Sequence, residues 1–217
     1  MGAAKRVRMT GQQRREQLVG VACSLFAEKG YEAASIEEIA ERAGVSKPVV
    51  YQHFGGKEGL YAVVVDREVR YLTTSLARAF EATHPRRIAE FAADAFLGYI
   101  EEHEEGFRVL VRDAPSGTTG TSFASVIADV ASRAEKLLIE EFSDRGFDQH
   151  TAPMYALMLV GAVALVGEWW LDHRAQPREV VAAHVVNLLW NGLRGLEPVA
   201  RVPEATADEG PAADPGS

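Results

Sequence analysis

Three features are scarce in this 217-residue sequence: cysteine, long apolar runs, and strand-like alternation of polar and apolar residues. The single cysteine, Cys23, cannot form an internal disulfide, which is typical of a protein in a reducing compartment. The longest run without an acidic, basic or histidine residue, 151–167, is at or just below the length that crosses a bilayer, so we expect a buried helix there. No apolar stretch of signal-peptide length follows the basic N-terminus, and we therefore expect a cytoplasmic protein.

The common arrangements of catalytic and metal-binding residues are also missing. His103 lies in the sequence EEHEE, which lacks the second histidine of the zinc motif His-Glu-x-x-His. His53 has no histidine, cysteine or carboxylate three or four residues away, and Cys23 lies beside the apolar stripe of a predicted helix. The glycines of 116–121 lack the lysine and the following helix of a phosphate-binding loop. The sequence therefore predicts no enzyme activity, no metal and no cofactor.

Charge is distributed unevenly along the chain. The formal net charge is −8, but residues 1–60 carry nine Lys/Arg and seven Asp/Glu, whereas the remainder carries fourteen and twenty-four. The basic residues of the arm at 1–10 are accompanied by no acidic residue. Asymmetry of this kind indicates that one part of the chain could contact nucleic acid.

The spacing of apolar residues predicts an all-α protein of about nine helices. Apolar residues recur at helical intervals from Leu18 to Phe26, and Lys29-Gly30 is a helix-end signal. A helix is expected from Lys57 to about Phe80. Later helices are predicted at 85–104, 106–113, 122–145, 152–174 and 178–196.

Residues 36–54 are predicted to form two short helices with a tight turn between them. Ser35 precedes the sequence IEEIAERA as an N-cap, and Glu38 three residues later completes a capping box. Gly44 can adopt the left-handed backbone that the turn needs, and Ser46 caps the second helix. This arrangement predicts a helix-turn-helix, whose second helix enters the major groove of DNA. The alternative is a helical hairpin with a solvated polar face, which the capped starts and the cationic face oppose.

If Val50 and Phe54 face inward, the second helix presents a polar outer face to DNA. Lys47 has donors for guanine acceptors, and Gln52 suits adenine. Apolar side chains beside them can contact a thymine methyl group, and nearby donors suit phosphate oxygens. We expect base contacts from Lys47, Pro48, Val49 and Gln52, and phosphate contacts from Ser35, Ser46, Tyr51, His53 and Lys57.

Residues 25–61, LFAEKGYEAASIEEIAERAGVSKPVVYQHFGGKEGLY, contain a Gly-Tyr pair after the first helix, a Gly-Val-Ser turn, Tyr-x-His-Phe and Lys-Glu, in that order. In these motifs the sequence resembles the TetR family of bacterial transcription regulators. The resemblance implies an omega-shaped homodimer with a three-helix DNA-binding domain and a larger ligand-binding domain. It implies base-facing roles for Lys47, Pro48, Val49 and Tyr51, and contacts to the DNA backbone from Ser35, Ser46, Tyr51, His53 and Lys57.

The expected domain organisation follows from the motif and from composition. A basic arm (1–10) precedes the helix-turn-helix domain (11–56), which is followed by a ligand-binding and dimerisation domain (57–196). The last part, 197–217, is rich in Pro, Ala, Gly and acidic residues and is expected to be disordered. The arm could follow phosphates or enter the minor groove, or it could serve only solubility. Gly56 departs from the family pattern, because many members carry serine or asparagine as the cap of the fourth helix.

Two predicted helices within 152–196 have wide apolar surfaces. The first is apolar nearly all round, and in the second the apolar residues from Val181 to Leu196 fall on one stripe. A helix that is apolar on all sides must be covered on all sides. In TetR-like proteins the last two helices form a four-helix bundle with their partner's copies. The resemblance therefore implies a homodimer through 152–196 and a palindromic operator.

A ligand pocket is expected in the larger domain, although its lining is harder to predict because core residues have the same character. The layout of FLGYIEEHEEGFRVLVRDA (96–114), followed by an apolar helix with a Trp pair, is similar to TetR members that sense fatty acids or acyl-CoA. For an anionic ligand, Arg112 or Arg108 would supply the counter-charge, unless they are ordinary surface residues. The predicted ligand-binding residues are Phe91, Phe96, Tyr99, Phe107, Arg112, Tyr155, Met158, Trp169 and Trp170.

These patterns indicate a ligand-responsive transcription regulator. We expect a repressor that leaves its operator when a small apolar effector binds. Two other classes stay open: an all-helical small-molecule-binding or enzymatic protein that retains an inherited helix-turn-helix, and a sequence-independent nucleoid protein. The capped helices with a basic face oppose the first, and the acidic, apolar remainder of the chain opposes the second.

Overall fold

The computed structural model describes residues 9–112 and 122–197. Within these ranges the chain forms nine α-helices, two short 3-10 turns and no strand, which confirms the all-α prediction. Most of the arm predicted at 1–10, the loop at 116–121 and nearly all of the tail predicted at 197–217 lie outside the described residues. The elements are α1 (Gly11–Ala33), α2 (Ile36–Ala43), α3 (Lys47–Phe54), α4 (Lys57–Ala77), η1 (Arg78–Glu81), α5 (Pro85–Glu102), α6 (Glu104–Val111), α7 (Phe123–Arg145), η2 (Gln149–Thr151), α8 (Ala152–Asp172) and α9 (Arg178–Arg194).

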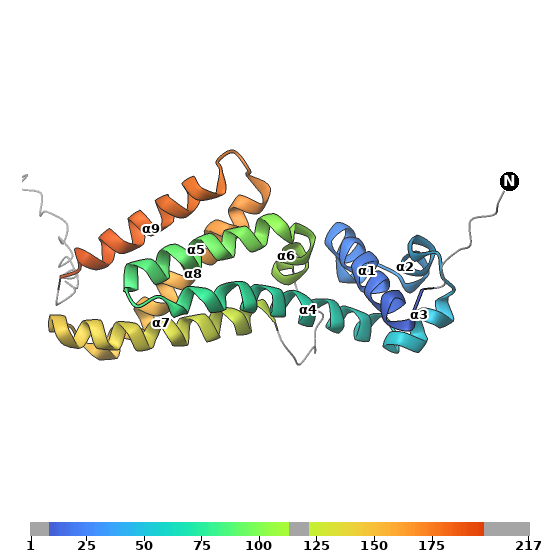
Figure 1. Ribbon diagram of the computed structural model, residues 1–217, viewed down its shortest axis with the longest axis horizontal. Helices are drawn as coiled ribbons and strands as arrows, with labels where there is room; N and C mark the ends of the chain where they lie inside the picture. Colours follow the sequence, from blue (N-terminus) through green and yellow to red (C-terminus); the bar gives the residue numbers. More distant parts are fainter. Residues whose placement is uncertain (1–8, 113–121, 198–217) are drawn as a thin grey trace, which may run out of the picture.

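Helices α1 to α3 form one end of an elongated molecule, and α5 and α7 to α9 form the other end (Figure 1). Helix α4 begins beside α3 and continues into the larger group, where it packs against α5. Helix α6 packs against both α1 and α4. The two ends of the molecule are therefore joined by α4 and by the contact between α6 and α1.

The predicted turn signals of the helix-turn-helix are confirmed in part. The Ser35 hydroxyl accepts a hydrogen bond from the Glu38 amide at 3.2 Å, and Gly44 ends α2 in the left-handed conformation, with φ 65°. The Glu38 carboxylate pairs with two basic side chains and so does not complete the predicted capping box. Ser46 is the N-cap residue of α3, as predicted, but its side chain makes no capping bond. Pro48 in the first turn of α3 already removes one backbone donor that a cap would satisfy.

Helix α1 continues for one turn beyond its predicted end. Gly30 has non-helical angles (φ 80°, ψ 168°), and the helix resumes after it as far as Ala33. Because this left-handed backbone favours glycine, Lys29-Gly30 marks a kink and not the end of the helix. The carbonyls of the added turn are bound by a side chain of α4, as described below.

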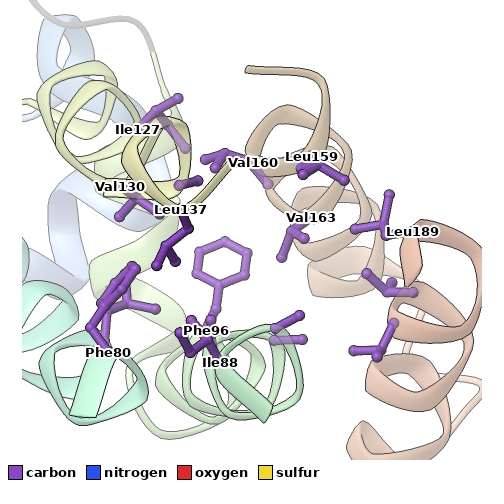
Figure 2. A pocket seen from close by; sticks show the side chains of 18 of the residues that line it. Phe80, Ile88, Phe96, Ile127, Val130, Leu137, Leu159, Val160, Val163 and Leu189 are labelled. Atoms are coloured by element: carbon purple, nitrogen blue, oxygen red, sulfur yellow. The ribbon is translucent and has the colours of Figure 1, made fainter. Parts of the chain in front are cut away.

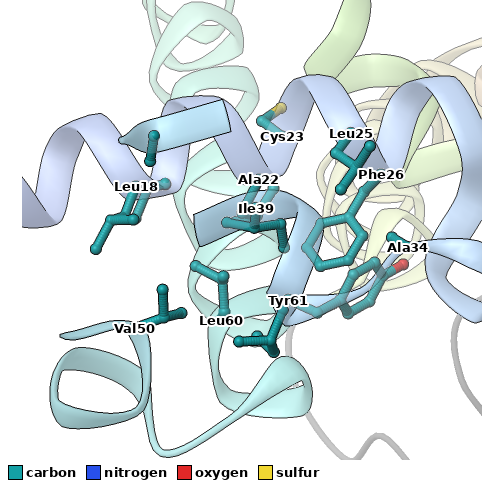
Figure 3. Close-up of a cluster of buried hydrophobic side chains, with 14 of the residues drawn as sticks. Leu18, Ala22, Cys23, Leu25, Phe26, Ala34, Ile39, Val50, Leu60 and Tyr61 are labelled. Atoms are coloured by element: carbon teal, nitrogen blue, oxygen red, sulfur yellow. The ribbon is translucent and has the colours of Figure 1, made fainter. Parts of the chain in front are cut away.

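Two hydrophobic clusters form most of the core, and α4 contributes to both. The first joins α1, α2, α3 and the start of α4, with Ile39 and Val50 fully buried in it (Figure 3). The second joins the later part of α4 to α5, α6, α8 and α9. On α4, Val64 belongs to the first cluster and Val69 to the second. Between them lies Glu68, the only buried charged residue in the described part of the chain.

Helices α8 and α9 leave a wide apolar surface uncovered in the single chain. Leu165 is 67% exposed and Leu188 is 73% exposed. By length and composition alone α8 could cross a membrane, but it packs against α5, α7 and α9 as a helix of the bundle. A helix with one packed face and one exposed apolar face is typical of a contact with another chain. The other large apolar residues exposed on these helices are Met154, Leu157, Met158, Trp169 and Val180.

Candidate DNA-binding surface and ligand cavity

Helix α3 separates a packed side from a polar side. Val50 is fully buried and Phe54 packs against the first cluster, as predicted. Val49 is half-buried and packs against the same cluster, so less of its side chain is open to a base than we predicted. The exposed residues of α3 are Lys47, Pro48, Tyr51 and Gln52.

Lys47, the first residue of α3, forms an ion pair with Glu37 of α2. The hydrogen bond from the Lys47 ammonium is the main reason why the pKa of the Glu37 carboxyl lies below its usual range. Both side chains are more than half exposed, so the pair contributes little to stability. An ammonium has three donors, and Lys47 therefore keeps capacity for a DNA acceptor. Nothing in the local sequence of Glu37 indicates a partner ten residues away.

The hydroxyl and imidazole groups predicted to contact phosphates lie on α3 or at the N-terminal ends of α2 and α3. The Ser35 hydroxyl accepts a bond within α2, which leaves its own hydrogen available to donate. Ser46 is exposed and its side chain does not cap α3. Tyr51 is 53% exposed, whereas His53 is half-buried beside Phe54, with ring centroids 5.9 Å apart. Their contacts with DNA stay predictions.

Lys57 differs from these residues because its ammonium is already bound within the protein. It donates to the carbonyl oxygens of Tyr31 at 2.9 Å, Glu32 at 3.2 Å and Ala34 at 3.2 Å. It also lies 4.3 Å from the centroid of the Tyr31 ring. These three acceptors match the three donors of an ammonium group. A phosphate contact by Lys57, which stays a prediction, would have to replace one of them.

At the other end of the molecule, the second cluster surrounds a cavity of about 170 Å³. Side chains from α4, α5, α7, α8, α9 and η1 line it, and Phe96, Ile88 and Val163 are among those that border it in Figure 2. Every lining residue is Ala, Val, Leu, Ile, Phe, Pro or Trp, so the walls carry no charged side chain. Such a cavity suits an apolar molecule or an apolar part of one.

The structure corrects the predicted lining of this cavity. Of the nine predicted residues only Phe96 borders it. Tyr99, Phe107 and Trp170 are buried elsewhere in the second cluster, and Tyr155 packs in a third cluster between α7 and α8. Phe91, Met158 and Trp169 are exposed, and Arg112 is exposed and donates to the Phe26 carbonyl at 3.5 Å. The walls consist mostly of aliphatic residues, with a few aromatic ones, from six elements, whose convergence no local pattern reveals.

A second, more polar hollow of about 310 Å³ adjoins the apolar cavity. Both are lined by Pro85, Leu137 and Trp190, among others, and the charged residues that the second hollow adds are Glu141, Arg145 and Arg194. Arg145 donates to the carbonyls of the last two residues of α9, both at 3.2 Å. The predicted counter-charges lie elsewhere: Arg108 is paired with Glu104 at 3.3 Å and with Asp172 at 2.7 Å. The basic groups beside the cavity are therefore at the end of the bundle formed by α7 and α9.

A buried polar group joins α4 to α5 and α6. The Glu68 carboxylate accepts from the Arg67 guanidinium at 2.7 Å and from the Tyr99 hydroxyl at 3.2 Å, and His103 lies 3.9 Å away. Burial, with the negative charge of Glu68, raises the pKa of Tyr99, so its hydroxyl stays a donor. The space beside the carboxylate exists because residue 106 is glycine. Tyr99 thus holds α4 to α5 and does not border the cavity.

Comparison with known families gives two matches along the chain. The family described as "Bacterial regulatory proteins, tetR family" matches residues 18–64, which include α2 and α3. The family described as "Tetracyclin repressor-like, C-terminal domain" matches residues 85–192, which include α5 to α8 and most of α9.

Individual relatives agree with these matches. The chain is 33% identical over 189 residues to the HTH-type transcriptional activator FasR of Mycolicibacterium smegmatis, covering 86% of this chain and 85% of FasR. It resembles the structure of a TetR-like transcriptional regulator from Rhodococcus sp. RHA1, with a TM-score of 0.71 and 26% identity over 87% of this chain and all of the other. The fatty acid degradation regulator FadR of Bacillus halodurans has the same fold, with a TM-score of 0.67 at 20% identity over 87% of this chain and 99% of FadR.

Proposed function

The chain belongs to the tetR family of bacterial regulatory proteins, and from this membership we propose how this ligand-responsive, DNA-binding transcription regulator acts. The protein binds a palindromic operator as a homodimer, and an apolar effector in the cavity weakens that binding. One observation supports the proposal most directly. Helix α4 connects α3, which has an exposed polar face, to the second cluster, which contains an apolar cavity.

Direct contact with bases comes from the exposed side of α3. Lys47 at its first position and Gln52 five residues later have donors that match base edges in the major groove. Pro48, Tyr51 and the open part of Val49 supply apolar contact. Around them, the hydroxyls of Ser35, Ser46 and Tyr51 and the imidazole of His53 contact phosphates and fix the register of the helix. The operator lies on the nucleoid, so we place the protein in the bacterial cytoplasm.

The homodimer forms through the exposed apolar surface of α8 and α9. Leu165 and Leu188, the two most exposed large apolar residues of the described chain, lie on this surface. A two-fold interface presents the same surface twice, so each copy covers the other's apolar residues. Two recognition helices related by a two-fold axis match two half-sites in successive major grooves, which is why the operator is a palindrome.

The effector places an apolar chain in the cavity and a polar head in the adjoining hollow. The cavity offers no charged partner among the residues that line it, whereas Arg145 and Arg194 border the adjoining hollow together with Glu141. A fatty acid or acyl-CoA combines the two parts. The names of FasR and of FadR do not settle the effector of this chain, and the similarity to the latter concerns the fold alone.

The effector proposal is tested with protein purified from its bacterial host. Mass spectrometry of the extracted ligand should find an acyl chain. Added to stripped protein, palmitate should weaken binding to operator DNA, and a fatty alcohol of the same chain length should act more weakly because it lacks the anionic head. A co-purified polar molecule, or palmitate without effect on DNA binding, would contradict the proposal.

Repression is the expected direction of control, because release of DNA by an effector frees a promoter that the regulator covers. FasR is named an activator, so the sign must be measured in this chain. A reporter gene placed behind the operator should rise when the gene for this protein is deleted. A reporter that falls on deletion would assign activation.

A further inference from the structure

Lys57, the first residue of α4, binds the end of a different helix. The kink at Gly30 leaves α1 with one short last turn, whose carbonyls have no partner further along the helix. The Lys57 ammonium donates to two of these carbonyls, those of Tyr31 and Glu32, and to that of Ala34, which precedes α2. A cation at this place also opposes the negative end of the helix dipole. One side chain therefore connects α1, the start of α2 and the start of α4.

Aromatic rings fix the position of this ammonium. The centroid of the Tyr31 ring lies 4.3 Å from the Lys57 Nζ atom. Tyr61, one turn after Lys57 on α4, contacts the Tyr31 ring, with the two centroids 4.9 Å apart. Phe26 of α1 packs on both rings, at 6.0 Å from Tyr31 and 5.2 Å from Tyr61. Figure 3 shows Phe26, Tyr61 and Ala34 close together at this corner of the first cluster. The ring cluster holds α1 and α4 together beneath the ammonium.

This corner fixes both ends of the segment that carries the recognition helix. Helix α3 is joined to the corner through α2 on its N-terminal side and through Gly55 and Gly56 on its C-terminal side. Neither glycine contributes a side-chain contact, and the N-cap of α4 makes no side-chain hydrogen bond. The direction of α4 relative to α3 therefore depends on what holds the first turn of α4. Lys57, in that turn, supplies three hydrogen bonds to the opposite side of the corner.

We propose that Lys57 is a positioning residue that sets the angle between α4 and the helix-turn-helix, and that it supports DNA binding through this angle and not through a phosphate contact. The role rests on the proposed function, since it presupposes a homodimer whose two α3 helices must match two half-sites. Lys47, whose ammonium has one partner and lies on the exposed face of α3, is the natural comparison. A lysine that contacts DNA and a positioning lysine respond differently to salt, to the spacing of the half-sites and to replacement of the ammonium group.

The test uses the full chain and a duplex selected from a random library with wild-type protein. Binding is measured over a range of salt concentrations, and on duplexes whose half-sites are moved apart or together by one base pair. The variants are Lys57→Met, which keeps the apolar stem, Lys57→Arg, which keeps the charge in a planar form, and Lys47→Met as the matched control. Circular dichroism and thermal melting of each variant check that it is folded.

The proposal predicts that Lys57→Met weakens binding about tenfold, because fewer molecules hold both α3 helices at the required angle. The slope of log affinity against log salt stays as in the wild type, and the preference for one spacing is reduced. Lys57→Arg is expected to bind as weakly as Lys57→Met, since a planar guanidinium does not fit the site formed by the three convergent carbonyls. Lys47→Met is expected to keep the preference for one half-site spacing. It should reduce the slope of log affinity against log salt, because the charge that it removes contacts DNA.

Three results would overturn the positioning role while leaving the proposed function intact. One is a salt slope that falls by about 0.9 for each Lys57 removed, together with full rescue by Lys57→Arg, because this is the behaviour of a phosphate contact. Another is unchanged binding in Lys57→Met. The third is a lower melting temperature with an unchanged spacing preference, which would make Lys57 a stabilising residue only. If the wild-type chain selects no duplex at all, the proposed function itself fails, and the positioning role fails with it.

Discussion

At the scale of single residues, similar side chains of the helix-turn-helix have different surroundings. Lys47 and Lys57 were both expected to contact DNA, yet one is an exposed residue with a single carboxylate partner and the other is held by three carbonyls. Residue type and spacing identified both as donors near DNA. The sequence could not show that the last turn of α1 comes to lie beside Lys57, since that depends on the kink at Gly30.

Tyr51 is the residue whose loss should weaken binding to every DNA sequence. Its hydroxyl lies on an exposed ring, and a phosphate contact carries no base preference. Tyr51→Phe should reduce affinity by about 1 kcal/mol, equally on the selected duplex and on unrelated duplexes. Tyr71→Phe is the matched control, because Tyr71 is a similarly exposed tyrosine of α4 within the larger domain. A loss confined to the selected duplex would assign Tyr51 to a base.

Cys23 should be a slow thiol in the folded protein. Burial, with a smaller contribution from the charge of Glu68, raises its pKa to about 12, so little thiolate is present near neutral pH. At pH 8 a disulfide reagent should label the folded chain at least about a hundredfold more slowly than the chain in denaturant. The folded state favours the neutral thiol, so this contribution to stability is complete below the unfolded pKa and falls as the pH rises above it. Labelling as fast as in denaturant would contradict the burial.

At the scale of elements, the sequence predicted the number and type of the helices well. The predicted segments at 85–104, 122–145 and 178–196 lie within two residues of α5, α7 and α9 at either end. These predictions succeed because a helix and its end signals are local. Two local end signals were misjudged: Ser46 is the N-cap residue of α3 but makes no side-chain capping bond, and α1 continues after Gly30. The cavity lining could not be predicted from local patterns, since its walls are apolar residues of six elements brought together by packing.

The contact between α5 and α8 depends on Gly167. A Cβ atom at this position would lie 2.7 Å from the Ile100 side chain and closer still to Phe96. Gly167→Ala should therefore lower the free energy of unfolding by about 1–3 kcal/mol through overpacking. Gly20→Ala is the control, because nothing lies within 4 Å of its added Cβ in α1. That variant should gain up to about 1 kcal/mol from helix propensity. Equal effects of the two changes in chemical denaturation would contradict the close packing.

At the scale of the whole molecule, one end carries the helix-turn-helix, the other contains the cavity, and α4 connects them. The first cluster fixes α3, the second surrounds the cavity, and Glu68 lies on α4 where the clusters meet. The Tyr99 bond to Glu68 holds α4 to the ligand-binding part, while Lys57 holds it to the DNA-binding part. A change in the cavity that moves α4 therefore reaches α3 through a short series of direct contacts.

The proposed homodimer should be sensitive to charge on α8. Leu165→Glu places a carboxylate in the expected interface, where it would be buried without a partner, so the variant should be a monomer in analytical ultracentrifugation. Ser132→Glu on the exposed side of α7 adds the same charge and should remain a dimer. The monomer should also bind the selected duplex far more weakly, because only one half-site is engaged at a time. A dimeric Leu165→Glu variant would place the interface elsewhere.

The central claim is that α3 of a two-fold dimer recognises a palindromic DNA sequence. The most direct test is selection of duplexes from a random library with wild-type protein and with Lys47→Met, followed by sequencing. We predict that the wild type enriches inverted repeats whose centres are separated by about one helical turn, or a multiple of it. Lys47→Met should retain the repeat but lose preference at one base pair in each half-site. Enrichment of no sequence, or of a sequence without two-fold symmetry, would contradict the account.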